Sequence, residues 1–525
     1  MAGVTPDSVI RLLIDVPIDK GYKNTIWFDN AEQQTNYFIN KTTACVMNQS
    51  MYVRVSEGRL RINVNADTVR KANYIMFQNH NYLNKWFYAF IDEPVYINDN
   101  CCEVNFTIDV VQTWLFDHLL LTSYVLREHT VTDNRGDNIQ PENVELGEYM
   151  TSYESGTGLL NDYFIIVFSA EPVPEVWHTD RGIVGGIYSG LYANIFGMND
   201  LSILHEYLDN LVATNNQDSV VSIKMFPADF CRRDTQTDQP VIKEVYAIAN
   251  ISNLGGYYPR NKKLLTYPYN LLNVYTGDGN SRTYRYEFFN TLVTPETDTP
   301  QCHFVIKSCF ASSEELILQP VGYLGYSGAN ISESLNLGNF PQCAFLIDTY
   351  RAWLAQNKTS LFTKGLISTA SAIGGALTLN PASFSTGVLG FVNLISNMVD
   401  AQNQPTISKG SQSGTISVAN REQDFHFACR NIMPEFARKI DDYFDMYGYA
   451  INEVKVPNRS SRPCWNYVQT VNCNLRGNVS SAILNELKNI YDAGITFWKL
   501  GSNNNDTLVG MYKNIDGTPR DNSPV

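Results

Sequence analysis

Charge is missing from one long part of this sequence. Residues 365–399 contain no Asp, Glu, Lys or Arg, and extending the run to residue 420 adds only Asp400 and Lys409. Charged residues make up 18% of the chain as a whole, so the run departs clearly from the rest. Ionised groups are costly in a protein core, in a bilayer or in the closed bore of an assembly. The run is therefore expected in one of these three places.

A conventional membrane anchor is also missing. A transmembrane helix needs about 20 consecutive apolar residues, whereas here Gly, Ser, Thr and Asn interrupt the apolar residues and Pro381 divides the run. Two helices joined at Pro381 would still form a hairpin of nearly membrane depth, at about 1.5 Å per residue. A Gly/Ser-rich flexible loop is the alternative.

Large apolar residues distinguish this segment from an ordinary linker. A loop that is apolar but not anchored suggests conditional exposure, in which the segment is hidden first and released later. The residues predicted to form this membrane-active loop are Leu366, Ile367, Ile373, Leu377, Leu379, Phe384, Val388, Leu389, Phe391, Val392, Leu394, Ile395 and Met398.

Clustered positive charge is missing as well. The net charge is −14, and the densest basic run is only Arg260-Asn261-Lys262-Lys263. Proteins that bind nucleic acid electrostatically neutralise phosphates with clustered Lys and Arg, so the composition argues against such a binding protein. A negatively lined bore would instead repel phosphates evenly. The charge is compatible with a conduit but does not establish one.

Catalytic and metal-binding patterns are not found. The ten cysteines form no CxxC pair, the seven histidines are dispersed, and neither GxSxG nor a phosphate-binding loop occurs. Asp441 and Asp442 could be proposed as paired carboxylates, but neighbours on a helix point about 100° apart. A solvated helix face is the expected explanation for them. We predict a protein that is not an enzyme and that holds no metal or cofactor.

A secretion signal is not evident either, because the first residues lack a basic stretch followed by an apolar one. The scattered cysteines are expected to be buried thiols of a protein made in a reducing cytoplasm. If such a protein acts outside its producing cell, it leaves by lysis or as part of a particle.

Two-residue alternation of apolar and polar residues dominates much of the chain and predicts half-buried antiparallel strands. Asn98-Asp99-Asn100 is a plausible hairpin tip between two of them. The expected fold class is β-rich α+β, with several domains. The strands are expected at residues 59–64, 104–110, 163–169, 219–227, 283–292, 303–310, 451–456 and 465–471, with helices at 201–211 and 483–491.

The expected divisions are an N-terminal β domain (1–131), a middle α+β domain (132–340), a segment with the apolar loop 365–420 between two helices (341–447), and a C-terminal segment (448–525).

Amphipathic helices are predicted on both sides of the uncharged segment, at residues 345–362 and 434–447. Pro434 suits the first position of the second helix, and Gly448 stands where a left-handed C-terminal cap is wanted. If the two helices pack as an antiparallel pair, they carry the apolar loop at the end of a stiff stalk.

An aromatic segment at residues 74–90 allows two interpretations. Exposed aromatic rings can stack on single-stranded nucleic acid, but Lys85 is the only basic residue in this stretch. Packing in a core or an interface is the stronger explanation.

Both ends of the chain resemble a known family. At the N-terminal end the similar residues are Tyr22-Lys23-Asn24-Thr25, Trp27-Phe28, the run 74–90, Ile108-Asp109-Val110, Gln112-Thr113-Trp114 and Arg127-Glu128-His129. At the C-terminal end they are Tyr447-Gly448-Tyr449, Ile451-Asn452, Val454-Lys455, Pro457-Asn458, residues 466–470, Cys473, Gly494-Ile495-Thr496 and Trp498. Together they resemble the tail knob, or distal tail tube, protein of small short-tailed phages of the Bacillus podovirus type. The similarity covers roughly the first 130 and the last 80 residues, and the apolar segment by position and character.

The resemblance implies a virion protein at the tip of a phage tail. It implies a tube of several subunits, expected to be a hexamer, in which residues 1–131 and 448–525 form the tube domain and double-stranded DNA passes through the bore without specific binding. It further implies contacts with other tail proteins and with host membrane lipids, reached by the loop 365–420. A receptor-binding module without a membrane role and a tail-associated wall-degrading enzyme are the alternatives.

Overall fold

The computed structural model divides the chain into two compact units. The first unit contains Met1–Leu146, Pro259–Leu264 and Glu435–Val525, and the second contains Gly147–Tyr258 and Leu265–Pro434. The expected segments 1–131 and 448–525 thus fall in the same unit. The structure describes residues 8–48, 52–79, 84–156, 163–174, 176–178, 183–184, 187–188, 192–197, 201–214, 219–227, 231–233, 240–242, 244–277, 279–294, 299–310, 314–337, 342–343, 425–500 and 509–524.

The first unit begins with an eight-stranded sheet in the order β3-β1-β6-β7-β9-β5-β4, with β8 also paired to β9. All of its strand pairs are antiparallel. Its strands are β1 (Ser8–Ile14), β3 (Thr43–Met47), β4 (Tyr52–Ser56), β5 (Arg59–Ile62), β6 (Ala72–Asn79), β7 (Trp86–Ile91), β8 (Val95–Asn98) and β9 (Cys101–Ile108). Three helices lie between these strands or just after them: α1 (Ala31–Ile39), α2 (Ala66–Val69) and α3 (Val110–Thr113).

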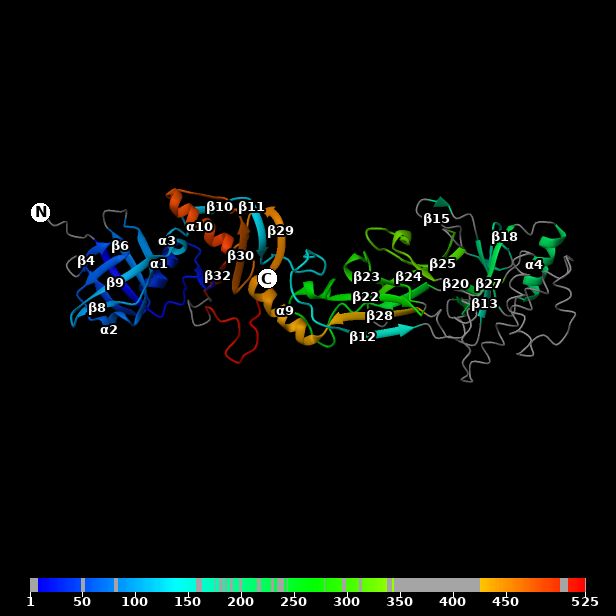
Figure 1. The fold of residues 1–525 in the computed structure, drawn as a ribbon, viewed down its shortest axis with the longest axis horizontal. Coiled ribbons are helices and arrows are strands. Elements are labelled where there is room, and N and C mark those ends of the chain that lie inside the picture. The colour runs from blue at the N-terminus through cyan, green and yellow to red at the C-terminus, as the bar shows by residue number, and fades with distance from the viewer. Residues whose placement is uncertain are drawn as a thin grey trace. The chain divides into compact units, whose positions relative to one another are not determined.

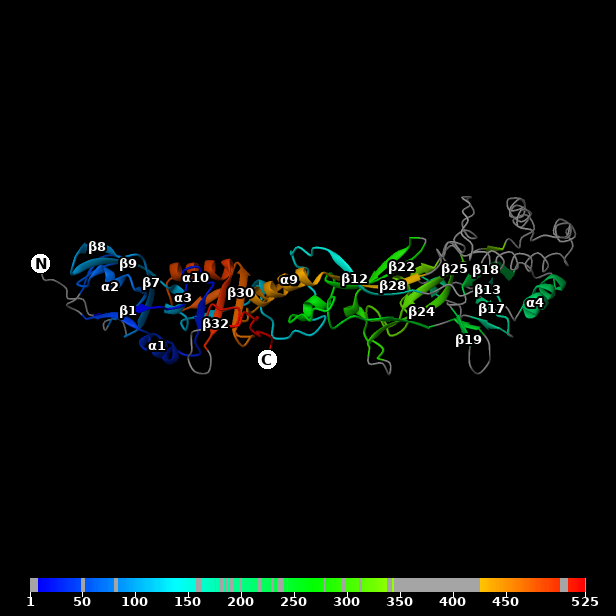
Figure 2. The ribbon, with the colours of Figure 1, turned by 90° about the horizontal axis from the view of Figure 1, so that it is seen from below.

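A second sheet of the first unit joins the two ends of the chain, in the order β2-β32-β30-β11-β29. Its one parallel pair is β2 with β32, in which Ile26 lies opposite Trp498. Helix α10 (Ser481–Ala493) packs beside β30, as Figures 1 and 2 both show. The strands are β2 (Thr25–Trp27), β11 (Ser123–Glu128), β29 (Tyr449–Lys455), β30 (Trp465–Val471) and β32 (Ile495–Lys499), and a separate pair is formed by β10 (His118–Leu120) and β31 (Leu475–Gly477).

Strand alternation divides the apolar side chains of the first unit between two cores. Successive residues of a strand point to opposite faces of its sheet. On β6, Ile75 enters one core with Leu12 and Ala89, whereas Tyr74 and Met76 enter the other. That second core also contains Trp465 and Trp498 of the second sheet, so it binds the two sheets together. Within the described part of residues 74–90, the aromatic side chains of Tyr74, Tyr88 and Phe90 are buried. Packing in a core therefore accounts for them.

The second unit contains two four-stranded antiparallel sheets, in the orders β12-β28-β22-β23 and β21-β24-β25-β26. Figure 1 shows β12, β28 and β22 side by side in the first of these. One core, which includes Leu272, Phe304 and Phe427, joins both sheets. The strands are β12 (Tyr149–Gly156), β21 (Glu244–Ile248), β22 (Asn270–Thr276), β23 (Ser281–Tyr284), β24 (Gln301–Phe310), β25 (Glu314–Pro320), β26 (Leu335–Leu337) and β28 (Phe425–Ile432).

The second unit also contains a five-stranded sheet, in the order β14-β17-β13-β18-β27, with helix α4 (Leu201–Ala213). Leu204 and Leu208 of α4 are buried, as their spacing predicts. The strands are β13 (Tyr163–Ser169), β14 (Trp177–His178), β17 (Tyr192–Phe196), β18 (Val220–Pro227) and β27 (Gln342–Cys343), with the short pairs β15 (Ile183–Val184) with β16 (Ile187–Tyr188) and β19 (Cys231–Arg233) with β20 (Pro240–Ile242).

The β-rich fold class with antiparallel sheets is confirmed. The strand expected at residues 283–292 is wrong beyond Tyr284, because β23 ends there and Tyr286–Phe288 form a 3₁₀ turn, η5. Asn290 then donates its backbone N–H to the carbonyl of Gly322 at 2.7 Å. The backbone after Tyr284 therefore makes hydrogen bonds with a loop and does not continue strand β23. The helix expected at 345–362 lies outside the described residues, and so does the stalk that it would form.

Two further observations, on membrane-spanning helices and on cysteines, concern only the described residues. Within them, no helix is both long enough and apolar enough to cross a membrane. Seven cysteines of this part of the chain are free thiols: Cys45, Cys101, Cys102, Cys302, Cys429, Cys464 and Cys473.

Candidate functional site

The apolar segment 365–420, with every residue predicted to act in it from Leu366 to Met398, lies outside the described residues. These residues therefore stay a prediction. The candidate site that the structure does describe lies in the first unit, around the densest basic run of the sequence.

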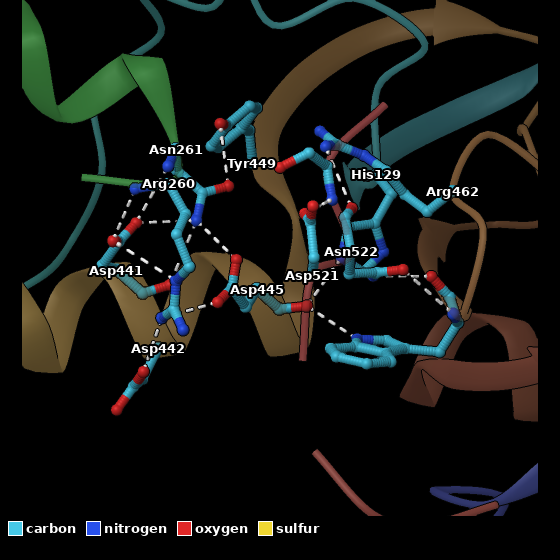
Figure 3. A network of polar contacts seen from close by, with 12 residues as sticks. His129, Arg260, Asn261, Asp441, Asp442, Asp445, Tyr449, Arg462, Asp521 and Asn522 are labelled. Atoms are coloured by element: carbon cyan, nitrogen blue, oxygen red, sulfur yellow. Dashed lines mark hydrogen bonds and ion pairs between the residues drawn. The ribbon is translucent and has the colours of Figure 1, made fainter. Parts of the chain in front are cut away.

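This basic run, Arg260-Asn261-Lys262-Lys263, is held by carboxylates from two other parts of the chain. We call these carboxylates the acidic socket: Asp133 and Glu142 from the loop after β11, and Asp441, Asp442 and Asp445 from helix α9 (Pro434–Tyr447). Figure 3 shows the part of the socket on α9, with Arg260 and Asn261 directed toward the three aspartates.

Three successive backbone N–H groups of the run each donate to a carboxylate oxygen. Arg260 donates to Asp441 Oδ2 at 2.9 Å, Asn261 to Asp441 Oδ1 at 3.0 Å, and Lys262 to Asp133 Oδ2 at 3.0 Å. They precede or begin the 3₁₀ turn η4 (Lys262–Leu265), and the first N–H groups of a helical turn have no partner within it. The carboxylates supply those partners, and charged acceptors make stronger bonds than neutral ones.

The side chains of the run add a second layer of contacts. Arg260 lies 2.6 Å from both Asp442 Oδ1 and Asp445 Oδ2 through its Nη2 atom. The Asn261 amide donates to Asp441 Oδ1 at 2.8 Å and to Asp445 Oδ1 at 2.7 Å. One asparagine thus bridges two aspartates that stand four residues apart, on one face of the helix.

Lys263 enters the most buried part of the socket. Its Nζ donates to Glu142 Oε1 at 2.6 Å, and the two side chains are 2% and 0% exposed. Arg127 contacts the other oxygen of Glu142, and the Lys263 ammonium lies 5.2 Å from the centre of the Tyr449 ring. A buried carboxylate with two cations and an aromatic face is fully compensated, so the contact fixes the run firmly in place.

Burial sets the protonation behaviour of the socket. It raises the pKa of Asp445 to about 7; nearby Asp441 and Asp442 also raise this pKa, whereas Arg260 and the Asn261 amide lower it. Burial likewise raises the pKa of Asp133 and lowers the pKa of Lys263. Each shift has the sign expected when a charged group leaves water.

The last turn of α9 is fixed by His129 and Trp465. His129 Nδ1 accepts the backbone N–H of Tyr467 at 2.7 Å, while Nε2 lies 2.9 Å from the carbonyl oxygen of Asp445 and donates to it. The Trp465 indole donates to the same carbonyl at 2.7 Å. His129 is therefore neutral, with its hydrogen on Nε2, and burial lowers its pKa to about 3, helped by Arg462.

The structure corrects one expectation about these residues. Asp441 is wholly buried and not part of a solvated helix face; only Asp442, 47% exposed at its side chain, fits that description. Local sequence holds no signal for this, because the partners Arg260 and Asn261 stand about 180 residues away. The hydrogen bonds and ion pairs of the site hold three segments of the chain together, which is a structural role. Among the described residues, no cluster of His, Cys, Asp or Glu could hold a metal ion.

Comparisons with known proteins place the chain in a family. A family model described as "Bacillus phage phi29, Tail knob protein gp9, C-terminal domain" matches residues 236–516, more than half of the chain. The chain belongs to the tail knob protein family. A second family model, described as the N-terminus of the caudoviral major tail protein, matches residues 6–119.

Individual tail knob proteins agree with this placement. The tail knob protein gp9 of Bacillus phage phi29 is 27% identical, over 93% of this chain and 96% of that protein. Those of Bacillus phages PZA and B103 are 26% and 25% identical with the same coverage. The structure of the bacteriophage C1 tail knob protein gp12 has the same fold, with a TM-score of 0.53 over 96% of this chain and 99% of that one at 16% identity.

Three expectations are confirmed by this membership. The resemblance to tail knob proteins is correct, the chain is a virion component of the phage tail, and it is a structural protein and not an enzyme. The wall-degrading alternative is thereby removed.

Proposed function

We propose that this tail knob protein forms an oligomeric tube, a hexamer, at the tip of the tail. The tube conducts genomic DNA and penetrates the host cytoplasmic membrane with residues 365–420. The observation that carries the membrane role is the uncharged, apolar character of that segment, in a chain matched by tail knob proteins over 93% of its length.

Storage and release of the segment follow from its composition. A single exposed copy would be an aggregation hazard, whereas several copies can bury one another inside a tube. In lipid the backbone polar groups must be satisfied internally, which requires helices or a closed assembly. Gly374-Gly375, Gly387 and Gly390 would allow helices to approach closely there.

The charge distribution supports passage of DNA without specific binding. The net charge is −14, and two of the three cations in the densest basic run, Arg260 and Lys263, are paired with carboxylates of the acidic socket, so they are not presented to phosphates. A tube of such subunits would repel a DNA duplex evenly along the bore. Other tail proteins would supply the adjoining parts of the conduit.

The test is deletion of residues 365–420 followed by two separate measurements. We expect the shortened protein to assemble into the same ring, seen by electron microscopy, and to lose the release of dye from liposomes that the full chain causes when triggered by acid or another stimulus. A matched control replaces the segment with a Gly/Ser linker of equal length. Collapse of the ring would mean that the segment is ordinary core, and unchanged leakage would remove its membrane role.

A receptor-binding module without a membrane role is the remaining alternative. It predicts that the intact assembly never permeabilises vesicles under any trigger but binds host cells. Class averages of the assembly viewed end-on would also measure its symmetry and the state of its bore.

A further inference from the structure

An open groove of about 840 Å³ lies in the second unit along strand β12, and residues 150–153 of that strand line it. Among the described strands, β12 pairs only with β28, so it is an edge strand. Met433 donates its backbone N–H to the carbonyl of Glu148 at 3.0 Å. The alternation of an antiparallel ladder therefore directs the N–H and C=O of Thr151 away from β28. The groove thus presents backbone groups of an edge strand to a partner.

The groove is electrically neutral. Among the described residues that line it, none carries a charge. Its apolar side chains include Met150, Ile248 and Ile251, and Asn250 adds an amide. With a net charge of −14 on each chain, two copies repel one another, and a contact between them is least opposed where neutral surfaces meet. The groove is therefore a suitable surface for a second copy.

A second neutral surface is the loop between β25 and β26. Residues 316–332 carry no charge. We call residues 324–326 the loop tip, where Leu324 and Tyr326 are 43% and 55% exposed. The N–H of Leu324 donates to the carbonyl of Phe288 at 2.9 Å, and the Asn290 amide donates to the carbonyl of Tyr326 at 3.0 Å. These bonds fix the backbone of the tip, which lowers the entropy cost of binding through its side chains.

Leu324 has a backbone conformation that is unfavourable for leucine. Its φ of 55° lies in the left-handed region, where a Cβ atom crowds the following carbonyl oxygen. Gly322 and Gly325 also have positive φ, but they have no Cβ. Strained residues are concentrated at functional sites. Because Leu324 is only partly buried in its own chain, burial by a partner gives its side chain a function that offsets the strain.

The groove and the loop tip lie on opposite edges of two packed sheets. On the groove side, Asn250, just after β21, donates to Ser152 of β12 at 3.2 Å. On the other side, Arg282 of β23 donates to the carbonyl of Ser334, just before β26, at 3.0 Å. Figure 1 shows β12 and β23 at opposite edges of their sheet. Two different surfaces on opposite edges can form a head-to-tail contact, which repeats from copy to copy and can close into a ring.

We propose that the loop tip of one copy enters the β12 groove of the next copy, with Leu324 and Tyr326 against its apolar side chains. This contact rests on the proposed function, because it assigns two surfaces to the ring of subunits. A few buried aromatic and aliphatic anchors carry most of the binding energy of an interface. Stable interfaces bury about 1,200–2,000 Å², so other surfaces of the two copies also take part.

Dilution of the full-length ring measures the contact, with the assembled fraction followed by mass photometry. Tyr326→Ala should raise the concentration of half-dissociation by about tenfold or more, as for an aromatic anchor. Thr151→Glu should also weaken the ring, because it places a charge in the neutral groove. Ser481→Glu adds the same charge at the exposed start of α10 and should leave the ring unaltered. Equal dissociation of the two glutamate variants, or no effect of Tyr326→Ala, would overturn the proposal.

Leu324→Asn separates docking from folding. Asparagine adopts the left-handed conformation more readily than leucine, so the subunit should unfold at a higher urea concentration. The ring should nevertheless dissociate at a higher protein concentration, because the apolar side chain is lost from the tip. A leucine that served only its own subunit would change both stabilities in the same direction, and that result would contradict the docking role.

Cross-linking identifies the partner of the tip. Copies with Tyr326→Cys are assembled with copies with Thr151→Cys, oxidised mildly and examined by mass spectrometry of their peptides. A disulfide between positions 326 and 151 must join different copies, since neither copy carries both substitutions. Its absence from an assembled ring, or a link from position 326 to another tail protein in phage particles, would overturn the docking alone. A full-length chain that stays monomeric at every concentration would overturn the ring as well.

Discussion

Gly448 packs directly against the main chain of Glu128. A Cβ atom at Gly448 would lie 2.2 Å from the carbonyl oxygen of Glu128, closer than any real contact allows. Gly448 also has a φ of 65°, and its N–H donates to the carbonyl of Phe444 at 2.8 Å to end helix α9. The glycine thus serves both as the left-handed cap expected from the sequence and as the point where α9 meets β11.

Replacement of Gly448 by alanine should destabilise the first unit strongly. The left-handed backbone costs a residue with a Cβ about 1–2 kcal/mol, and the clash with Glu128 should add about 1–3 kcal/mol. The measurement is urea unfolding followed by tryptophan fluorescence, since Trp465 and Trp498 are buried in this unit. Gly517→Ala is the matched control, because Gly517 has a φ of 83° with nothing within 4 Å of its would-be Cβ. Equal losses in the two variants would show that the contact with Glu128 contributes nothing.

Asp441→Asn should cost far more stability than Asp442→Asn. Asp441 is buried and accepts two backbone N–H groups, whereas the side chain of Asp442 is half-exposed and contacts only Arg260 among the described hydrogen bonds. Breaking a buried charge network costs about 3–5 kcal/mol, and loss of a surface pair costs about 0–1 kcal/mol. The comparison is made by urea unfolding at pH 7.5. Similar values for the two variants would contradict the assigned role of Asp441.

Sequence patterns predict an element correctly where neighbouring residues determine its ends. Strand β30 covers the expected residues 465–471, and α9 begins at Pro434 and ends before Gly448 as expected. Proline at a first helical position and glycine after the last one act through their own backbone, so the sequence reports them directly. The strand expected at 283–292 was partly wrong because alternation continues through Tyr284 and Tyr286, both buried, while the chain turns into η5.

Long-range polar contacts could not be predicted in the same way. Ile26 pairs with Trp498, and Asn261 bonds to Asp441, but neither pair has a periodic pattern that links the two partners. Buried Asp441 accepts hydrogen bonds from Arg260 and Asn261, which belong to a six-residue segment from the middle of the chain. A single sequence shows that carboxylates and a basic run exist; it does not show that they meet.

Acid should destabilise the first unit through His129. Its folded pKa is lowered to about 3, so the unfolded chain binds the proton first, and stability present above pH 6.5 is lost progressively as the pH falls below it. Protonation of Nδ1 would also break the bond from the Tyr467 N–H. His129→Gln should be less stable at pH 7.5 by about 1–3 kcal/mol, since buried partners lose their bonds, yet lose less on acidification. Urea unfolding from pH 7.5 to 4.5 measures both effects. His178→Gln is the control, and a slope unchanged by His129→Gln would contradict the assignment.

Asp109 should produce the opposite dependence on pH. Asp109 is fully buried, caps α3 by accepting the Gln112 N–H at 3.0 Å, and accepts the Tyr74 hydroxyl at 2.9 Å. Burial raises its pKa to about 6 although both bonds favour the ionised form. Because the folded state then binds a proton more readily than the unfolded chain, its contribution is present at low pH and lost as the pH rises through 6.

Asp109→Asn should remove this gain while keeping an oxygen that can accept from Gln112. Between pH 7.5 and 5 the unaltered protein should gain about 1 kcal/mol relative to the variant, measured as the difference in unfolding free energy at each pH. Asp67→Asn removes a carboxylate from an exposed position in α2 and should follow the unaltered protein. The comparison distinguishes the effect of burial from the effect of net charge. Both substitutions remove one negative charge, but the carboxylate of Asp109 is buried whereas that of Asp67 is exposed to water. A parallel profile for Asp109→Asn and the unaltered protein would mean that Asp109 stays ionised in the fold, held by its two donors against the cost of burial.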